Sequence, residues 1–469
     1  MEILVRRRAL ALLAFVACAG FASSARAAPI GSLFSGATAD DPAATYYNPA
    51  AMTQIAGTQG LLWSGLAFVR GHYQRDTRDA YSGQSFPQAD LNVLKPGPNG
   101  GVVTSAGLRR WRFGLGFSVP ILDGAQWPAE TEGRPSSTRY HALSARLLEL
   151  AIQPSVAFRV TRFLSLGLGV DVVGVQLAHE VQTDFGAKIN QLACEGVGAG
   201  RPCAVDTPLA RENPAYAALT TVKGFGWSAG VGAGVLVTPR RWLRLGLGVR
   251  SGGFRVRIPV NMRVELPGAV TQYVRNNLPS VKLPELEAEG EVEVTSPMRV
   301  TAGIALFPIR PLELAVDFQW IDKSAMSILV GNIHRSSSSL ISDQVLIKTS
   351  LDVFHLALRA AYRVHRTLRL ALRVEWEPNT RPERFTSPGS VDFDRVALLA
   401  GLAYSPFRWL TVLAEYGRYF AFSRTVGASN YAPNASPTTP EEEGLDKTSP
   451  TGRYSAEIDR VGLGVLLSF

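Results

Sequence analysis

The sequence predicts an all-β protein, a 14-stranded antiparallel transmembrane β-barrel with an N-terminal hatch that plugs its lumen. Three observations predict this fold. Apolar residues alternate with small or charged residues throughout the chain, short arginine-containing turns alternate with long polar connections, and no run of eighteen apolar residues follows the first 27 residues. We expect a signal peptide at 1–27, the hatch at 28–56 and the transmembrane β-barrel at 57–469.

The first 27 residues have the composition of an export signal. Three arginines at 6–8 precede an apolar run at 9–20 that is too short to cross a bilayer, and Ala25-Arg26-Ala27 has the small-x-small pattern of a cleavage site. We therefore expect cleavage after Ala27. A cytoplasmic protein with an apolar N-terminal helix is one alternative, and a lipoprotein modified at Cys18 is another.

Alternation with a period of two indicates membrane strands. Between Leu368 and Trp376, leucine, valine and tryptophan point one way, while Arg369, Arg373 and Glu375 point the other. One such strand would also suit a soluble sandwich. The same pattern recurs, however, at 164–172, 243–250 and 460–469, which favours a barrel with apolar residues toward lipid and polar residues toward the lumen.

The turns allow the strands to be counted. Six short turns each place an arginine before an alternating segment, at Arg110, Arg162, Arg241, Arg310, Arg366 and Arg408. Seven long polar connections separate them, near 71–100, 120–145, 181–220, 259–290, 323–345, 378–391 and 421–452. Thirteen connections require fourteen strands, and an even number places both termini on the side of the short turns, which we expect to be periplasmic. Interfacial positions are expected for Trp111, Trp242 and Trp409, although ordinary hairpin packing would also explain them.

Charge and cysteine content exclude several classes of function. Removal of the signal lowers the formal net charge from +9 to +6, and no basic block or stripe remains that would indicate binding to nucleic acid. Cys194 and Cys203 would meet an oxidising compartment, so a disulfide is expected rather than free thiols. The six histidines are scattered and show no metal-ligand spacing, so we expect no metal and no cofactor.

One motif could indicate an enzyme. Gly226-Trp227-Ser228-Ala229-Gly230 matches the nucleophile-elbow pattern, which requires a strand, a sharp turn and a helix. Here the motif continues into the alternating segment 231–235 instead. We therefore predict that the protein is not an enzyme.

The segment ahead of the first strand does not alternate. It contains Asp40-Asp41-Pro42 and Asn48-Pro49-Ala50, and Asp-Pro and Asn-Pro pairs favour turns. A compact segment of this kind could fold into the lumen, whereas a disordered leader is the alternative. Together with residues 35–39, these motifs resemble the N-terminal hatch of the FadL-type family of long-chain fatty-acid transporters, which includes the TodX-like branch for aromatic hydrocarbons.

The resemblance implies a passive, monomeric channel of the bacterial outer membrane. Its partner would be a hydrophobic small molecule, a fatty acid or a hydrocarbon, captured by apolar extracellular loops, held in a deeper pocket and released sideways into outer-membrane lipid. The gating hatch would include Asp40, Asp41, Asn48, Pro49 and Ala50. Ahead of these residues the family has a longer tip than the segment 28–34 found here, so gating by withdrawal of that tip is not implied.

Further site residues follow from the same resemblance. Lateral release in the family uses an inward kink in the third strand, which we expect from about Trp111 to Pro120, with the proline ending the strand. The capture surface is expected in loops 181–220 and 259–290 and includes Val264, Leu266 and Tyr273. The lumen charges either form ion-paired ladders or bind a substrate carboxylate, and they are Arg250, Arg369, Arg373 and Glu375.

The C-terminal residues suggest how the barrel reaches the membrane. Leu467-Ser468-Phe469 resembles the last strand by which barrel-insertion machinery recognises its clients. A polar-solute porin is the second functional hypothesis. A porin would not need the turn-rich segment 40–50.

Overall fold

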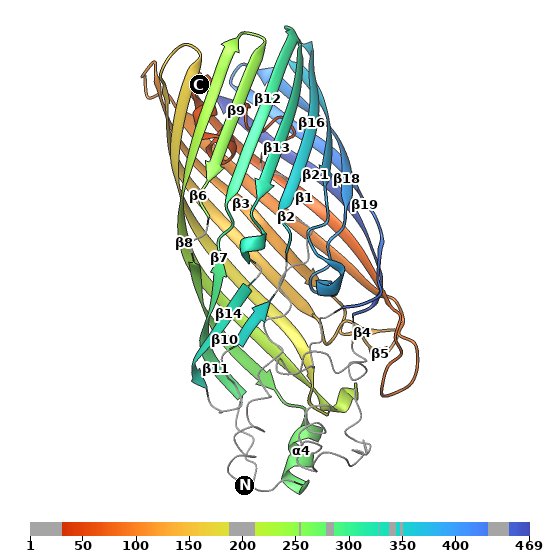
Figure 1. Cartoon of the computed structure of the whole chain (residues 1–469). Coiled ribbons are helices and arrows are strands. Elements are labelled where there is room, and N and C mark those ends of the chain that lie inside the picture. Colours follow the sequence, from red (N-terminus) through yellow and green to blue (C-terminus); the bar gives the residue numbers. More distant parts are fainter. Residues whose placement is uncertain are drawn as a thin grey trace.

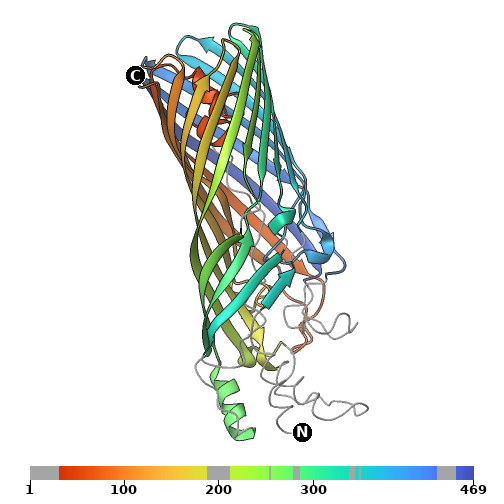
Figure 2. The same cartoon turned by 60° about the vertical axis from the view of Figure 1, so that its left-hand side comes forward.

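The computed structural model describes residues 31–186, 212–252, 255–277, 286–326, 328–336, 344–347, 350–429 and 450–469. Within these ranges fourteen antiparallel strands form a closed barrel (Figures 1 and 2). In chain order they are β1(Thr58–Arg75), β2(Ala89–Thr104), β3(Trp111–Gln126), β6(Ser144–Arg159), β7(Leu164–Asp184), β8(Ala217–Arg240), β9(Leu243–Arg250), β12(Arg299–Ile309), β13(Leu312–Ile321), β16(Val353–His365), β17(Leu368–Glu377), β18(Arg395–Phe407), β19(Leu410–Ala421) and β21(Gly452–Ser468). Each pairs with the next, and β21 closes the ring on β1. The predicted 14-stranded barrel is confirmed.

The wall has the expected polarity. In β17, Leu372 is 57% exposed on the outer surface, whereas its neighbours Arg373 and Glu375 are buried toward the lumen. An apolar outer surface suits acyl chains, and lumen charges can pair with one another. No helix in the described ranges is long and apolar enough to cross a membrane.

The two ends of the barrel differ. The six short turns and the C-terminus lie at one end, which we call the short-turn end (top of Figures 1 and 2). Phe469 and Thr58 exchange backbone hydrogen bonds there, which ties the last strand to the first. The longer connections gather at the opposite, long-loop end.

At the long-loop end the wall continues beyond the closed ring (Figures 1 and 2). Four strands and a helix form this extension, β10(Arg255–Glu265), β11(Leu286–Thr295), β14(Ile328–Ser336), β15(Gln344–Ile347) and α4(Gly268–Asn277). β10 pairs with β8 and β11, and β11 pairs with β14. Smaller elements in the connections are β4(Glu130–Thr131), β5(Arg134–Pro135), β20(Arg424–Val426), η2(Pro214–Tyr216), η3(Ser324–Met326) and η4(Glu383–Phe385).

Several strands are longer than the sequence suggested. The connections expected near 71–100, 120–145 and 259–290 contain residues of β1, β2, β3, β6, β10 and β11. The expectation that Pro120 ends the third strand is wrong, because β3 continues to Gln126 and the register with β6 only shifts between Ser118 and Ile121. A proline is tolerated within a strand where its missing N–H faces no ladder partner, as at a bulge.

Candidate functional site

A compact segment fills the lumen near the short-turn end, where its red ribbon is visible inside the barrel (Figures 1 and 2). This hatch spans residues 31–56 of the described chain and contains α2(Ala44–Tyr47) and the 3-10 helix η1(Pro49–Gln54). Ala44, Ala50, Ala51 and Met52 are completely buried. The hatch therefore packs against the wall as a plug does.

Asn48 organises the centre of the hatch. Its backbone is extended (φ −162°, ψ 99°), and its side-chain oxygen accepts a hydrogen bond from the Ala50 N–H over 3.1 Å, which caps η1. Its amide nitrogen donates to the backbone oxygens of Ala37 over 2.9 Å and of Val235 in β8 over 3.0 Å. Pro49 occupies the first position of η1, where a missing N–H costs nothing. One side chain thus joins two hatch segments to the wall.

Glycines on the lumen side of the wall make room for the hatch. A Cβ atom at Gly248 would lie 2.0 Å from the Tyr47 backbone oxygen, and one at Gly246 would lie 2.3 Å from that of Ala37. A Cβ at Gly167 would lie 2.3 Å from the Ala50 nitrogen. The glycines that alternate with leucine in β7 and β9 therefore let the hatch backbone approach the wall.

Arginines from five strands donate to backbone oxygens of the hatch. Arg112 binds Ile55 over 2.6 Å and Arg373 binds Ser35 over 3.3 Å. Further contacts of this kind join Arg159 to Thr53, Arg250 to Thr45 and Tyr46, and Arg359 to Phe34. Guanidinium groups suit this role because their several N–H groups can bind a carbonyl and a carboxylate at once. We call these five residues the arginine cage.

Lumen carboxylates complete the cage. Asp317 accepts from the Ala37 N–H over 3.0 Å, and Glu415 accepts from the Leu33 N–H over 2.7 Å. Glu415 also pairs with Arg460 over 2.8 Å. Buried charges in the lumen are therefore paired with one another or with the hatch, as the cost of burying an isolated charge requires.

The four predicted lumen charges lie within this network. Arg250 pairs with Asp171 and binds the hatch, and Arg373 pairs with Glu375 over 2.8 Å. Arg369 pairs with Glu313, and its guanidinium carbon lies 4.8 Å from the ring centre of Phe34. Of the two interpretations left open by the sequence, ion-paired ladders describe these contacts. A direct contact with substrate stays a prediction.

The two hatch aspartates have different surroundings. The Asp40 carboxylate is half-exposed and lies 3.6 Å from Arg244. Asp41 is buried and accepts hydrogen bonds from Ser35 Oγ over 2.7 Å and from the Ala43 N–H over 2.9 Å. Burial raises the pKa of the Asp41 carboxyl to about 6, because the charged form loses its hydration.

The extension at the long-loop end reverses the polarity of the wall. Along β10 the inward residues are apolar, among them Ile258, Val260 and Met262, whereas Arg257 and Arg263 point outward and pair with glutamates of β11. The inward side chains join a cluster with residues of β7, β8 and β11. A charged exterior places this region in water or among headgroups, and its apolar interior forms what we call the entrance cluster.

The predicted capture residues belong to the entrance cluster. Val264 lies in β10, one residue before its end, and is buried, while Leu266 and Tyr273 pack against the cluster from the segment that includes α4. Tyr273 makes an edge-to-face contact with Tyr216, with ring centres 6.3 Å apart. The structure thus brings these residues together, but on the interior rather than on an open loop surface.

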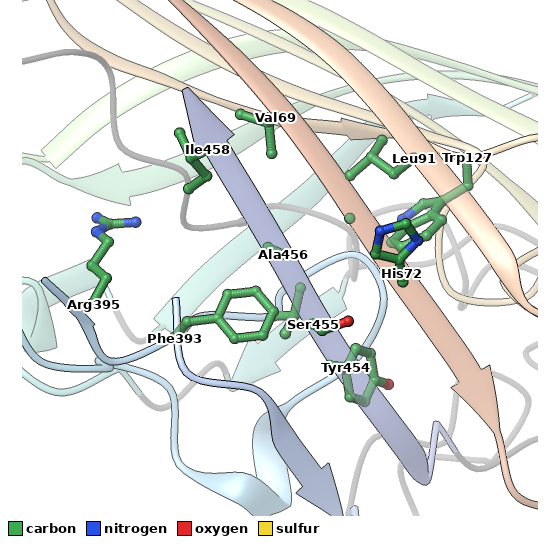
Figure 3. Close-up of a pocket in the computed structure, with 12 residues that line it drawn as sticks. Val69, His72, Leu91, Trp127, Phe393, Arg395, Tyr454, Ser455, Ala456 and Ile458 are labelled. Atoms are coloured by element: carbon green, nitrogen blue, oxygen red, sulfur yellow. The ribbon is translucent and has the colours of Figure 1, made fainter. Parts of the chain in front are cut away.

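A second apolar site lies on the lumen side of the wall (Figure 3). It is a small cavity of about 30 Å³ between side chains of β1, β2, β21 and the connection ahead of β18. Its walls are mainly apolar, with Arg395 as the cation, and they include Val69, Leu91, Trp127, Phe393, Tyr454 and Ile458. Arg395 pairs with Glu377 over 2.6 Å. We call this site the lumen pocket.

Sequence reasoning missed the lumen pocket and part of the cage. Trp127 and Phe393 lie in connections without period, so nothing in their spacing marks them as neighbours. Arg112, Arg159 and Arg359 could have been found, because each occupies an inward position of an alternating strand. Cys194 and Cys203 lie outside the described residues. Within those residues no three His, Cys, Asp or Glu side chains are grouped as metal ligands.

The wall is interrupted between β2 and β3. These strands pair only from Gly100–Phe117 to Thr104–Phe113, and toward the long-loop end the described residues contain no further pair between them. β2 remains paired with β1, and β3 with β6, on the far sides. Three prolines without an N–H lie along this interruption, at Pro96, Pro98 and Pro120. The sequence itself thus removes donors from the two facing edges.

The hatch reaches the interruption. The Gly31 N–H donates to the side-chain oxygen of Asn99 in β2 over 2.9 Å. Asn99 is buried and lies one residue beyond the last β2–β3 pair. A change in the hatch can therefore act directly on the edge of β2.

The comparisons with known proteins give one family match and several solved structures of similar fold. The family model described as outer membrane protein transport protein (OMPP1/FadL/TodX) matches residues 10–455. The structure resembles that of a Pseudomonas aeruginosa FadL homologue, with a TM-score of 0.73 and 19% identity over 98% of this chain and 99% of that chain.

Two solved toluene transporters have similar folds. The Ralstonia pickettii transporter TbuX gives a TM-score of 0.62 and 16% identity over 93% of this chain and 96% of that chain. The P. putida toluene transporter TodX gives a TM-score of 0.61 and 15% identity over 91% of this chain and 94% of that chain. A search of curated protein sequences found no match.

Proposed function

The chain belongs to the OMPP1/FadL/TodX family of outer-membrane transport proteins, and we propose that the hydrophobic compounds it passes are chiefly long-chain fatty acids. The observation that carries this proposal is an apolar interior at the long-loop end of a lumen that the hatch plugs near its other end. A hydrophobic molecule gains free energy from leaving water at such a surface, roughly 25 cal/mol for each Å² of apolar area buried. An ion or sugar gains nothing there.

Capture begins at the entrance cluster. Val264, Leu266 and Tyr273 contribute to an apolar surface whose exterior is charged, so the path of lowest free energy for a hydrophobic solute leads inward. Val270 of the helix α4 is part of the cluster, so we expect α4 to move when a long chain enters. No energy source is needed, because binding inside only has to exceed hydration outside.

Release is proposed to be sideways. The interruption between β2 and β3 leaves the lumen pocket separated from lipid by side chains rather than by a hydrogen-bonded ladder. An apolar molecule that leaves there enters acyl chains and avoids the polar cage around the hatch. The contact from Gly31 to Asn99 lets the position of the hatch control this exit.

An aromatic hydrocarbon is the second candidate. The lumen pocket is lined by the rings of Trp127, Phe393 and Tyr454, and its cation Arg395 is already paired with Glu377. An uncharged aromatic solute would need these side chains to move apart, but it would displace no carboxylate. The printed names of TbuX and TodX as toluene transporters support keeping this candidate.

The orientation and processing follow the same proposal. We place the short-turn end and both mature termini in the periplasm, with cleavage after Ala27 and a disulfide between Cys194 and Cys203. The protein would be a monomer that barrel-insertion machinery recognises through its last strand. Surrounding outer-membrane lipid would receive the released substrate.

Uptake in cells tests the proposal. Cells without their own hydrophobic transporter would express this chain, and uptake of radiolabelled oleate and toluene would be compared with an empty-vector control. Val260→Asp places a charge in the entrance cluster and should abolish uptake, whereas Asn261→Asp on the outer face of β10 should leave uptake unchanged. Uptake of neither compound by a folded barrel would refute the proposal.

Conductance tests the porin alternative. A plugged barrel in a planar bilayer should pass little current, whereas a polar-solute porin should give large steady currents. A large conductance from the unaltered chain, together with uptake of sugars, would favour the porin.

A further inference from the structure

The short-turn end carries a collar of positive charge. Each of the six short turns contains at least one exposed arginine, and none of these turns contains aspartate or glutamate. A collar of one sign attracts anions, and its effect is strongest where the cations lie close together at the membrane surface. Charge alone does not select one anion from another, so a specific site needs a second feature beside the collar.

An apolar groove crosses the outer wall below one part of the collar. It has a volume of about 340 Å³ and runs over β12, β13, β16 and β17. The small side chain of Ala360 forms its floor, between the larger Leu314 on β13 and Leu372 on β17, which are its paired neighbours. Leu306, Leu358 and Val374 also line the groove. The groove is therefore shaped by one small residue in a row of large ones.

Two collar arginines lie beyond the end of this groove. Arg310 occupies the turn between β12 and β13, and Arg366 occupies the turn between β16 and β17. Both are exposed, and within the described residues no carboxylate pairs with them. Tyr362 lies between Ala360 and Arg366 in the chain, on the same outer face of β16 as Ala360. It is 47% exposed and has the amphipathic character of an interfacial residue.

We propose that this face of the wall is a binding site for an anionic phospholipid of the periplasmic leaflet. One acyl chain would lie in the groove over Ala360, and the phosphate would bind Arg310 and Arg366. A guanidinium group can bind two phosphate oxygens at once, and an acyl chain of the same lipid reaches the groove within half the thickness of a bilayer. A free phosphate would leave the groove empty, and a free hydrocarbon would leave the arginines unused.

Native mass spectrometry of the folded full-length protein in mild detergent tests this site. Phosphatidylglycerol and phosphatidylethanolamine of equal chain length would be added separately. Phosphatidylglycerol should bind with the higher occupancy. Arg310→Gln/Arg366→Gln should reduce that occupancy about tenfold. Ala360→Phe, which fills the groove without changing charge, should reduce it as well.

A matched variant removes the same charge elsewhere. Arg110→Gln/Arg162→Gln lies in turns of β2–β3 and β6–β7, away from the groove, and should retain the wild-type occupancy. An equal loss in this variant would overturn the site in favour of unselective attraction by the whole collar. Equal binding of the two phospholipids would also overturn the site. The arginines would then be candidates for contact with an acidic periplasmic protein instead. Preferential binding of lipid A at the same arginines would overturn the assignment to the periplasmic leaflet.

This inference does not depend on the transported compound. Uptake of oleate or toluene should be the same in the Ala360→Phe variant, because the groove faces lipid and the lumen pocket lies inside the wall. Loss of lipid binding with normal uptake would leave the proposed transport standing, and loss of uptake with normal lipid binding would leave this site standing.

Discussion

Arg250 and Tyr46 join the wall of the barrel to its plug, because Arg250 Nε donates to the backbone oxygen of Tyr46 over 2.6 Å. The same guanidinium binds the Thr45 backbone oxygen and pairs with Asp171 on β7. One side chain of β9 therefore holds the hatch helix α2 and neutralises a lumen carboxylate. Other members of the arginine cage repeat this arrangement around the lumen.

The first prediction removes this contact. Arg250→Met should free the hatch and leave Asp171 buried without its partner, at a cost of about 3–5 kcal/mol. The plug should then open more often, so planar bilayers should show larger and more frequent currents. Arg257→Met, which removes an outward arginine of β10, is the control and should conduct like the wild type. An unchanged conductance in Arg250→Met would contradict a role for the cage in closure.

The second prediction concerns the close approach of wall and hatch. Gly248→Val adds atoms where a Cβ alone would lie 2.0 Å from the Tyr47 oxygen, so the hatch must shift. We expect a loss of about 1–3 kcal/mol in hatch stability. Ala51→Cys places a thiol at a buried position of the hatch. A maleimide should label this thiol faster when the hatch is destabilised. Gly60→Ala meets no atom closer than 3.8 Å and should label at the original rate.

The third prediction is a pH dependence set by Asp41. Its carboxyl has a pKa of about 6 in the hatch and 3.8 as an exposed group, so the folded hatch holds the proton more tightly. Protonation therefore stabilises the hatch fully below about pH 4, and this contribution is lost as the pH rises through 6. The loss is about 3 kcal/mol.

Hydrogen exchange of the hatch amides measures this dependence. Protection of residues 41–54 should be greater at pH 4 than at pH 7, after correction for the intrinsic rates. Asp41→Asn, which cannot ionise, should remove the difference, and Asp40→Asn should keep it because that carboxylate is half-exposed. The same pH dependence in Asp41→Asn would assign it to another group.

The fourth prediction concerns the exit. Pro96→Val, Pro98→Val and Pro120→Val together restore N–H donors to the facing edges of β2 and β3. The ladder should extend beyond Gly100, and uptake of oleate should fall severalfold while the barrel stays folded. Pro259→Val in β10, which lies within a paired register, is the control. Normal uptake with a demonstrably extended ladder would argue against lateral release.

The fifth prediction distinguishes the two substrate classes. Trp127→Leu removes an aromatic wall of the lumen pocket and its hydrogen bond to the Pro388 oxygen. Toluene uptake should fall more than oleate uptake if the pocket selects aromatic rings, since ring contacts contribute about 0.5–1.5 kcal/mol beyond buried area. Equal reductions would favour a general apolar pocket. Phe163→Leu on the outer surface is the control for toluene.

The local alternation of residues was sufficient to predict the barrel wall, but not to predict where its strands end. Leu372 and Arg373 had to face opposite sides of a sheet, and the arginine turns fixed where the strands reverse. The strands β10 and β11 escaped prediction because their many charged residues suit a polar connection as well as a strand, and alternation alone does not show which face of a wall is apolar. Pro120 was misjudged because a single strand does not reveal whether its neighbour will demand an N–H.

Sequence alone therefore determined the fold class, the number of strands and the presence of a turn-rich segment before the first strand, because these depend on a repeat of two residues and on local turn chemistry. Tertiary structure alone decided what the lumen charges do. Arg373 and Ser35 lie 338 positions apart in the chain, yet they meet in the hatch. Such meetings depend on the closure of the ring and the register of every strand between them, which no local periodicity specifies.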